Sequence, residues 1–346
     1  MLEVKDLIAL AKATANADKD APVAYSYEGK NYSYNQVNQA LRNELNELVG
    51  SPALYRENSN KLFALIEEVI GDTVPNKVRD AYMDMAETKV FAQGEKPVFR
   101  RKVNARTRAK QFITRGGLEG VYEVFKLGGS ESFEVPTSAI GGAAQIGLEE
   151  FLDGRTDFAE LIEIVMDGIQ ETIQLEVGKA LIAGIQQLPE ANRVNHAGFD
   201  EEEFDRLLTI ADSYGSGKAV IYCDFKFAAK LMPANIQLFS ENMKNELWEK
   251  GYFTTYKNHQ VIILPNGLKD ETNSELVMDP GYCWIIPTGA NGDKPVRIAF
   301  EGATLVDERK NADWSRDIQV YKKVGVVALL TNDICVFHDT SLTAAL

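Results

Sequence analysis

The stretch TDFAELIEIVMDGIQETIQLEVGKALIAGIQQLP, residues 156–189, decides the fold class of this chain. Its apolar residues recur at steps of three or four, and no proline interrupts the pattern before Pro189. This spacing predicts a spine helix over residues 156–187, about 45 Å long. The apolar stripe consists of Phe158, Leu161, Ile162, Val165, Ile169, Ile173, Val177, Leu181 and Ile185. A helix of this length with one apolar stripe needs a large flat partner, normally a β-sheet.

The end of the chain offers strands for that sheet. Residues 296–306 read as one strand, and residues 318–337 are too long for one strand and predict two. The residues that share one face at period two are Ile318, Val320, Val324, Val326, Ala328 and Leu330. We expect these terminal strands to lie beneath the long helix.

Residues 195–295 read as a separate α/β unit. The acidic run Asp200–Glu203 opens a helix, where negative charge is favourable at the positive end of the helix dipole. The strands expected after it cover residues 219–224, 260–265 and 282–287, with a short helix near residues 225–232.

Residues 1–95 read as mostly helical. Apolar spacing predicts helices over residues 35–48, 62–70 and 78–90, with a break at residues 73–75 that contains Pro75. None of these helices is long enough to be stable alone in water, so they must dock on something. An N-terminal helical arm or a small helical subdomain is the expectation.

Residues 96–137 change in character. Residues 96–103 and 121–127 alternate apolar and polar positions as strands do, and a long polar connection separates them. Two strands around such a connection make an extended hairpin with little core of its own, which is marginal in isolation. We expect this hairpin to lie on a neighbouring subunit.

Charge is distributed unevenly along the chain. The formal net charge is −14, yet residues 96–126 carry +7 against −5 before them and −16 after them. The basic residues considered for contact are Arg100, Arg101, Lys102, Arg106, Arg108, Lys110 and Arg115. A positive segment in an acidic chain favours contact with a second copy of the same chain. A solvated loop tip and nucleic-acid contact are the alternatives. Nucleic-acid contact is disfavoured because Phe112 is the only aromatic residue between the basic ones, which is poor for stacking on bases.

The acidic side of that contact is expected at the start of the long helix. The candidates are Glu149, Glu150, Asp153, Asp157 and Glu160, with Glu163 further along.

The sequence offers no motif for catalysis, a cofactor or a metal. Cys335 and His338 are spaced to opposite faces of a strand, and Cys223, Cys283 and Cys335 all stand in apolar strands as core thiols do. The segment Gly215–Lys218 resembles a phosphate-binding loop only superficially, because a strand and not a helix follows it. No apolar run approaches the roughly 20 residues of a membrane span, the N-terminus does not resemble a secretory signal, and three cysteines fit a reducing compartment.

The order of elements resembles the major capsid proteins of tailed bacteriophages, with the Hong Kong 97-type shell fold. The residues that carry the resemblance are Ser132–Ser138 leading into the helix Phe158–Ile185, then Val220–Phe227, and finally Asp317–Leu330. The similarity covers about residues 96–340 and rests on arrangement, since no short motif defines this family.

The resemblance implies an α+β fold in four parts. These are an N-terminal helical arm (1–95), an extended hairpin loop (96–137), a peripheral domain (138–190 and 296–346) and an inserted α/β axial domain (191–295). It also implies a structural protein and not an enzyme. Copies would assemble as pentamers and hexamers into an icosahedral shell around double-stranded DNA, as the virion capsid built in the host cytoplasm. Scaffold, portal and decoration proteins are further partners that the resemblance implies.

Two other functions remain open at this stage. An encapsulin-type compartment has the same fold but encloses a cargo protein, so the content of particles discriminates it. A soluble α/β enzyme with an unrecognised carboxylate site predicts a small discrete oligomer and no shell.

Overall fold

The computed structural model describes residues 4–16, 25–27, 30–83, 85–102, 130–146, 158–215, 217–232, 241–269, 272–288, 294–310 and 316–345. The helices are α1 (Val4–Asn16), α2 (Tyr34–Val49), α3 (Pro52–Ala81), α6 (Phe158–Ile185), η1 (Glu190–Asn192), α7 (Glu201–Tyr214), α8 (Phe225–Ala228) and α9 (Glu241–Lys250). The first strands are β1 (Tyr25–Tyr27), β2 (Lys30–Tyr32), β3 (Ala86–Phe91), β4 (Val98–Lys102), β5 (Ser130–Glu134), β6 (Ser138–Ile146) and β7 (Arg193–His196). The later strands are β8 (Val220–Cys223), β9 (Thr255–Tyr256), β10 (His259–Ile263), β11 (Tyr282–Ile286), β12 (Val296–Lys310), β13 (Arg316–Ala328) and β14 (Cys335–Asp339).

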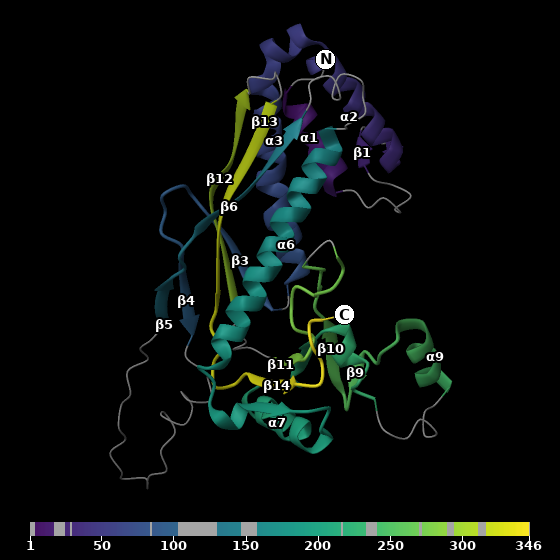
Figure 1. Ribbon diagram of the computed structural model, residues 1–346, viewed down its shortest axis with the longest axis vertical. Helices are drawn as coiled ribbons and strands as arrows, with labels where there is room; N and C mark the ends of the chain where they lie inside the picture. The colour runs from purple at the N-terminus through teal and green to yellow at the C-terminus, as the bar shows by residue number, and fades with distance from the viewer. Residues whose placement is uncertain are drawn as a thin grey trace, which may run out of the picture.

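Two sheets organise the molecule. The first, called here the long sheet, has the order β3-β12-β13-β6, and α3 and α6 lie beside each other over one of its faces (Figure 1). The second, called here the mixed sheet, has the order β7-β14-β11-β8-β10-β9 and lies at the far end of α6 (Figure 1). A compact fold with helices over a sheet buries the apolar side of both.

The long helix is confirmed within two residues of its predicted ends, as α6. Its residues Ile169, Ile173 and Leu181 are at most 3% exposed and pack with Val320 and Val324 of β13. The predicted stripe therefore faces the predicted strand, and the long sheet is the flat partner that the helix required.

One residue of that sheet face breaks the apolar pattern. Lys322 lies between Val320 and Val324 at period two, yet its side chain is buried. Its Nζ donates a hydrogen bond to the backbone carbonyl of Gly302 at 2.9 Å. Burial lowers the pKa of the Lys322 ammonium, because desolvation disfavours the charged form.

The helices predicted over residues 62–70 and 78–90 are wrong in their boundaries. Residues 52–81 form one continuous helix, α3, with Pro75 inside it, and residues 86–91 form strand β3. An interior proline costs a helix about 3 kcal/mol. Here that cost is outweighed because the residues around Pro75 are buried against the long sheet, among them Ile70, Val74 and Val78. The helix predicted over residues 35–48 is confirmed as α2.

Residues 52–91 of the N-terminal region do not form a separate arm. Strand β3 pairs in parallel with β12 from Val296↔Ala86 to Glu301↔Phe91. Because α3 and β3 contribute to the same core as α6, residues 52–91 are part of the long-sheet layer. Helix α1 is bound to α3 by Lys12, whose Nζ lies 3.2 Å from Oε1 of Glu68.

The strands and the helix predicted within residues 195–295 are present, and these strands lie in the mixed sheet. The three predicted strands appear as β8, β10 and β11, and the predicted helix appears as α7 with Asp200 as its N-cap. The Asp200 carboxylate accepts hydrogen bonds from the backbone N–H groups of Glu202 and Glu203. The acidic run therefore begins a helix, as expected.

One prediction for the terminal strands is wrong, namely that all of them lie in the sheet beneath the long helix. Residues 318–337 do form two strands, but only β13 joins the long sheet. Strand β14 lies between β7 and β11 in the mixed sheet, pairing antiparallel with β11 and parallel with β7. Its residues Val336 and Phe337 are buried there, so the chain returns to the α/β unit before it ends.

The hairpin begins as predicted, but with a different partner strand. The predicted first strand appears as β4, and its antiparallel partner is β5, in the register Val98↔Glu134 to Lys102↔Ser130. The strand predicted over residues 121–127 lies outside the described residues.

Candidate assembly surfaces

The base of the hairpin is anchored on the face of the long sheet opposite α6. Phe99 of β4 and Val135 are fully buried against Ala299 of β12. The Phe99 ring lies 6.2 Å from that of Phe133 and 5.7 Å from that of Phe91, between ring centroids. Aromatic pairs of this geometry stabilise a contact beyond their buried area, so the base has a small core of its own.

Glu301 binds three segments together at this base. Its carboxylate accepts hydrogen bonds from Oγ1 of Thr137 at 2.5 Å, from the backbone N–H of Gly94 at 3.2 Å and from Nζ of Lys323 at 3.2 Å. The hydrogen bonds, that of Thr137 foremost, lower the pKa of Glu301. The turn before β4, the segment after β5 and the sheet are therefore held by one ionised side chain.

The structure places part of the predicted basic surface. Arg100 is exposed on β4, on the side opposite Phe99, because successive side chains of a strand alternate between faces. Arg101 and Lys102 continue β4 and pair with Glu131 and Ser130 of β5. Arg106, Arg108, Lys110 and Arg115 lie outside the described residues.

The predicted acidic surface is mostly outside the described residues. This applies to Glu149, Glu150, Asp153 and Asp157, whereas Glu160 is on α6. The contact between the two predicted surfaces is one between subunits, and it stays a prediction.

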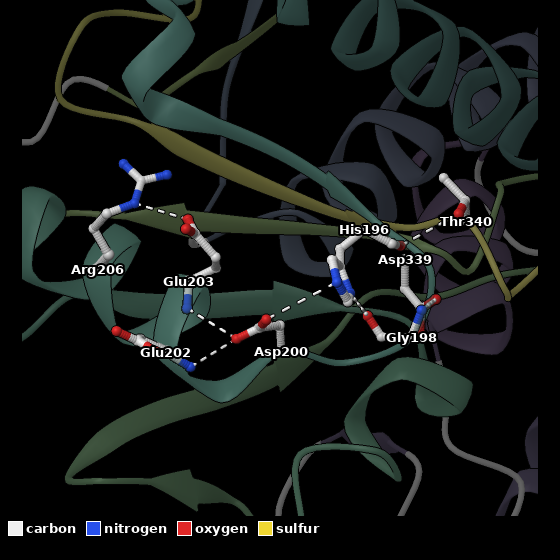
Figure 2. Close-up of polar contacts among 8 residues, drawn as sticks. All are labelled: His196, Gly198, Asp200, Glu202, Glu203, Arg206, Asp339 and Thr340. Carbon is white, nitrogen blue, oxygen red and sulfur yellow. Dashed lines mark hydrogen bonds and ion pairs between the residues drawn. The ribbon is translucent and has the colours of Figure 1, made fainter.

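A second polar cluster lies where β7, β14 and the start of α7 meet, and Figure 2 shows its members. His196 Nδ1 lies 3.1 Å from the carbonyl oxygen of Gly198, and its Nε2 lies 3.9 Å from Oδ2 of Asp200 (Figure 2). On α7, Arg206 Nε donates to Glu203 at 2.8 Å. The cluster fixes the loop before α7 and so the direction in which that helix leaves the mixed sheet.

Asp339 is the buried centre of this cluster. Its carboxylate accepts hydrogen bonds from the backbone N–H groups of Gly198 at 2.7 Å and Ser341 at 2.8 Å, and from Nζ of Lys230 at 2.8 Å. Burial by itself raises the pKa of Asp339, but the hydrogen bonds from Lys230, Ser341 and Gly198 outweigh it and lower this pKa to about 2. Asp339 therefore stays ionised and holds the two ends of the mixed-sheet unit together.

The lowered pKa of Asp339 predicts loss of stability in acid. A carboxylate with a folded-state pKa near 2, against 3.8 for the unfolded chain, stabilises the fold above the unfolded value by about 2 kcal/mol. That stabilisation is lost as pH falls from about 4 to about 2. Asp339→Asn should lower the unfolding free energy at pH 7 by about 3 kcal/mol, since it leaves Lys230 without its anion. Urea unfolding of unassembled protein at pH 7 and pH 2.5 measures both effects. The exposed Asp307→Asn is the matched control, and an Asp339→Asn chain as stable as this control would contradict the assignment.

The three cysteines that the sequence predicts as core thiols lie among the described residues. No cluster of three or more His, Cys, Asp or Glu side chains that could hold a metal occurs among them. Cys223, Cys283 and Cys335 are buried in the mixed sheet, where desolvation raises the pKa of the thiols of Cys283 and Cys335. Such thiols are core residues and poor nucleophiles.

Gly215 caps the end of α7, and Gly217 and Lys218 lead into β8, as expected for a connection from a helix to a strand. A Cβ on Gly215 would lie 2.7 Å from the carbonyl oxygen of Thr288, so glycine is needed for close packing here. Among the described helices, none has the length and apolarity that a membrane-spanning segment requires.

The family comparison matches a capsid family, and the structure comparison finds a similar fold in a phage procapsid. Residues 7–334 match the family described as "SPbeta prophage-derived putative capsid protein YonB". No curated protein sequence matches the chain. Among solved structures, the satellite phage P4 procapsid including size determination (Sid) protein is similar with a TM-score of 0.51 and 9% identity, over 77% of this chain and 90% of that chain.

Two further solved structures match at lower scores. A phage-related protein from Bordetella bronchiseptica RB50 has a TM-score of 0.48 and 12% identity, over 79% of this chain and 97% of that one. The virus-like particle from Pyrococcus furiosus has a TM-score of 0.41 and 14% identity, over 77% of this chain and 98% of that one.

The family match spans nearly the whole chain, and the fold agrees with it independently. Helices over a long sheet, a hairpin anchored on its opposite face and a mixed sheet beyond α6 together form a phage-capsid type of α+β fold, Hong Kong 97-like. The chain belongs to the YonB family of prophage-derived capsid proteins.

Proposed function

We propose that this chain self-assembles as pentamers and hexamers into an icosahedral shell that encloses double-stranded DNA. The observation that carries the proposal is the capsid family match over residues 7–334, together with a fold similar to that of a phage procapsid. The shell is the capsid of a virion, and assembly takes place in the host cytoplasm with the help of scaffold, portal and decoration proteins.

The parts of the fold take the following roles in the shell. The long sheet with α3 and α6 is the peripheral domain, and the mixed-sheet unit, residues 193–286 with β14, is the axial domain around the five-fold and six-fold axes. This division extends the expected peripheral domain to residues 52–91 and returns β14 to the axial domain, in keeping with the sheet order.

The hairpin lies over the adjacent subunit in this proposal. Its base is fixed to its own chain by Phe99 and Glu301, which gives the hairpin a defined direction. The basic residues from Arg100 to Arg115 bind acidic residues of the neighbour, with Glu149, Glu150, Asp153, Asp157 and Glu160 as the candidates. Opposite potentials favour one register of association and speed the encounter.

The net charge suits a container for DNA. A formal charge of −14 on each chain favours an acidic inner wall, to which packaged DNA does not adhere.

The content of purified particles tests the proposal. Particles from cells that carry the complete phage genome should protect double-stranded DNA from nuclease, and the DNA should be released when the shell is opened. Mass measurement of dissociated particles should show pentamers and hexamers of the 38.4 kDa chain. Particles that contain a single cargo protein and no DNA would contradict a genome shell and indicate an encapsulin-type compartment.

A further inference from the structure

The long sheet ends on one side in an edge strand without charge. Strand β6 is nine residues long, and beyond it the sheet has no further strand among the described residues (Figure 1). Residues 135–148, which include all of β6, contain no charged side chain, although charged residues make up 25% of the chain. An edge strand presents a row of unpaired backbone N–H and C=O groups, to which a further strand can be added.

The other edges of the long sheet and the mixed sheet are protected. Strand β3, at the opposite edge of the long sheet, carries Glu87 and Lys89 within six residues. The mixed sheet ends in β7, which has four residues and contains Arg193, and in β9, which has two residues. Short length and charged side chains are the usual devices that prevent association of sheet edges. Strand β6 has neither device, and its register with β13 is unbroken by a bulge.

The edge is held firmly in its own sheet and is accessible from outside it. Strand β6 pairs with β13 along its whole length, and Tyr321 is the partner of Gly141. A Cβ on Gly141 would lie 2.7 Å from Cδ1 of Tyr321, so the ring packs closely on the glycine. An aromatic ring packed on a strand glycine replaces the contacts of the missing side chain. Gly141 and Gly142 are both exposed, so neither is covered by the described residues.

Charge and symmetry identify the strand that fits this edge. A second copy of the chain has the same net charge of −14, and like charges placed together at an interface cost several kcal/mol. Two copies can therefore meet most readily along a segment to which neither contributes charge, as residues 135–148 do. An antiparallel pair of identical strands is two-fold symmetric and uses the same surface on both copies. Full overlap of Ser138–Ile146 with itself places Gly142 opposite Gly142, where no side chain separates the two backbones.

We propose that β6 of one copy pairs antiparallel with β6 of a second copy about a two-fold axis at Gly142, so that the two long sheets become one continuous sheet. The inference rests on the proposed function, because it places this pair in the shell. Neighbours within a closed five-fold or six-fold ring meet through heterologous contacts, whereas a two-fold contact is isologous. The β6 pair therefore joins neighbouring pentamers and hexamers and is distinct from the hairpin contact.

A disulfide at the axis tests the pairing directly. Directly opposite residues of an antiparallel pair have Cβ atoms about 4.5–5.5 Å apart, close to the roughly 3.5–4.5 Å of a disulfide. Gly142→Cys should therefore give disulfide-linked dimers when assembled particles are oxidised and analysed on a non-reducing gel. A Cβ on Gly142 meets nothing within 4 Å, and the three native cysteines are buried. Gly168→Cys is the matched control, because Gly168 is an exposed glycine of α6 with equally open surroundings, and it should give no dimers.

Charge at the same position provides a second test. Gly142→Lys places two like charges opposite each other, which should weaken each contact by up to about fivefold, and the loss multiplies because the contact repeats around every ring. Rings of Gly142→Lys or of Gly142→Glu should therefore form without associating further, whereas a mixture of the two kinds of ring should associate. Analytical ultracentrifugation measures this association, and circular dichroism confirms that each variant is folded. Gly168→Lys is the control and should form shells.

The outcomes separate the inference from the proposed function. Shells in which Gly142→Cys gives no more dimer than Gly168→Cys would overturn the inference alone. Gly142→Lys shells as stable as those of Gly168→Lys would overturn it as well, and would leave the shell itself in place. A wild-type chain that forms neither rings nor shells would contradict the proposed function, and the inference with it.

Discussion

Replacing Ile169 by aspartate should leave no soluble, folded protein. Ile169 is 3% exposed on α6 and faces the long sheet within the main core. A buried, unpaired carboxylate costs several kcal/mol, which is of the order of the whole stability of a domain, about 5–15 kcal/mol. The effect is expected to be the largest of any substitution considered, and soluble yield together with circular dichroism measures it.

The same helix provides the control for this substitution. Ile164 is 62% exposed, so Ile164→Asp introduces the same charge and the same change of side chain without burial. This variant should remain soluble and folded. A soluble Ile169→Asp chain that assembles as the wild type does would show that the buried face of α6 has been assigned wrongly.

Reversing the charges at the hairpin base should abolish assembly while the monomer stays folded. The change is Arg100, Arg101 and Lys102 to glutamate, on the strand β4 from which the basic segment begins. Removing three cations and adding three anions in a contact with acidic residues turns attraction into repulsion, which costs several kcal/mol in each contact. Because Arg100 is exposed and opposite the buried Phe99, its reversal leaves the core of the hairpin base intact. Electron microscopy and sizing chromatography, with circular dichroism on the monomer, measure the result.

A control for net charge separates a local contact from general repulsion. Arg56, Lys61 and Arg79 are exposed on α3, and their reversal changes the charge of the chain by the same amount. Shells should form in this control at moderate salt, because screening reduces interactions beyond about 10 Å. Normal shells from the Arg100, Arg101 and Lys102 variant would exclude the hairpin contact.

The sequence predicted those elements whose apolar residues repeat with the period of a helix or a strand and face the core. Helix α6 and strand β13 have one apolar face each, and both were predicted with their burial. Helix α3 was predicted as two pieces, because Pro75 breaks isolated helices, whereas packing of Ile70, Val74 and Val78 on the sheet keeps the helix continuous. Strand β3 was missed since residues 78–90 fit a helical period locally, and only the pairing with β12 decides their conformation.

The residues that hold the hairpin base and the polar cluster together could not be predicted from the sequence. Glu301 accepts from Thr137 across a separation of 164 residues, and Asp339 accepts from Gly198 across 141. A single carboxylate in a strand looks like many others, and only the fold brings its donors together.

The fold connects the hairpin base with the mixed-sheet unit, the two parts that are proposed to contact neighbouring subunits. The long sheet carries the hairpin base on one face and α6 on the other, and α6 leads to the mixed sheet with α7 and α9 (Figure 1). In the proposed shell, the long sheet therefore sets the direction in which the hairpin base leaves and the position of the mixed-sheet unit. Because both surfaces are fixed to the same core, small differences at the contacts between subunits can set the curvature of the shell.

Electron microscopy of the purified, recombinantly expressed protein tests the central claim most directly. If this chain is a shell protein, negative-stain images of the fraction eluting early from a sizing column should show closed icosahedral particles or flat arrays of hexamers. A chain that elutes as a monomer or dimer at every concentration, and that shows no particles or arrays when produced together with its phage partner proteins, would contradict it.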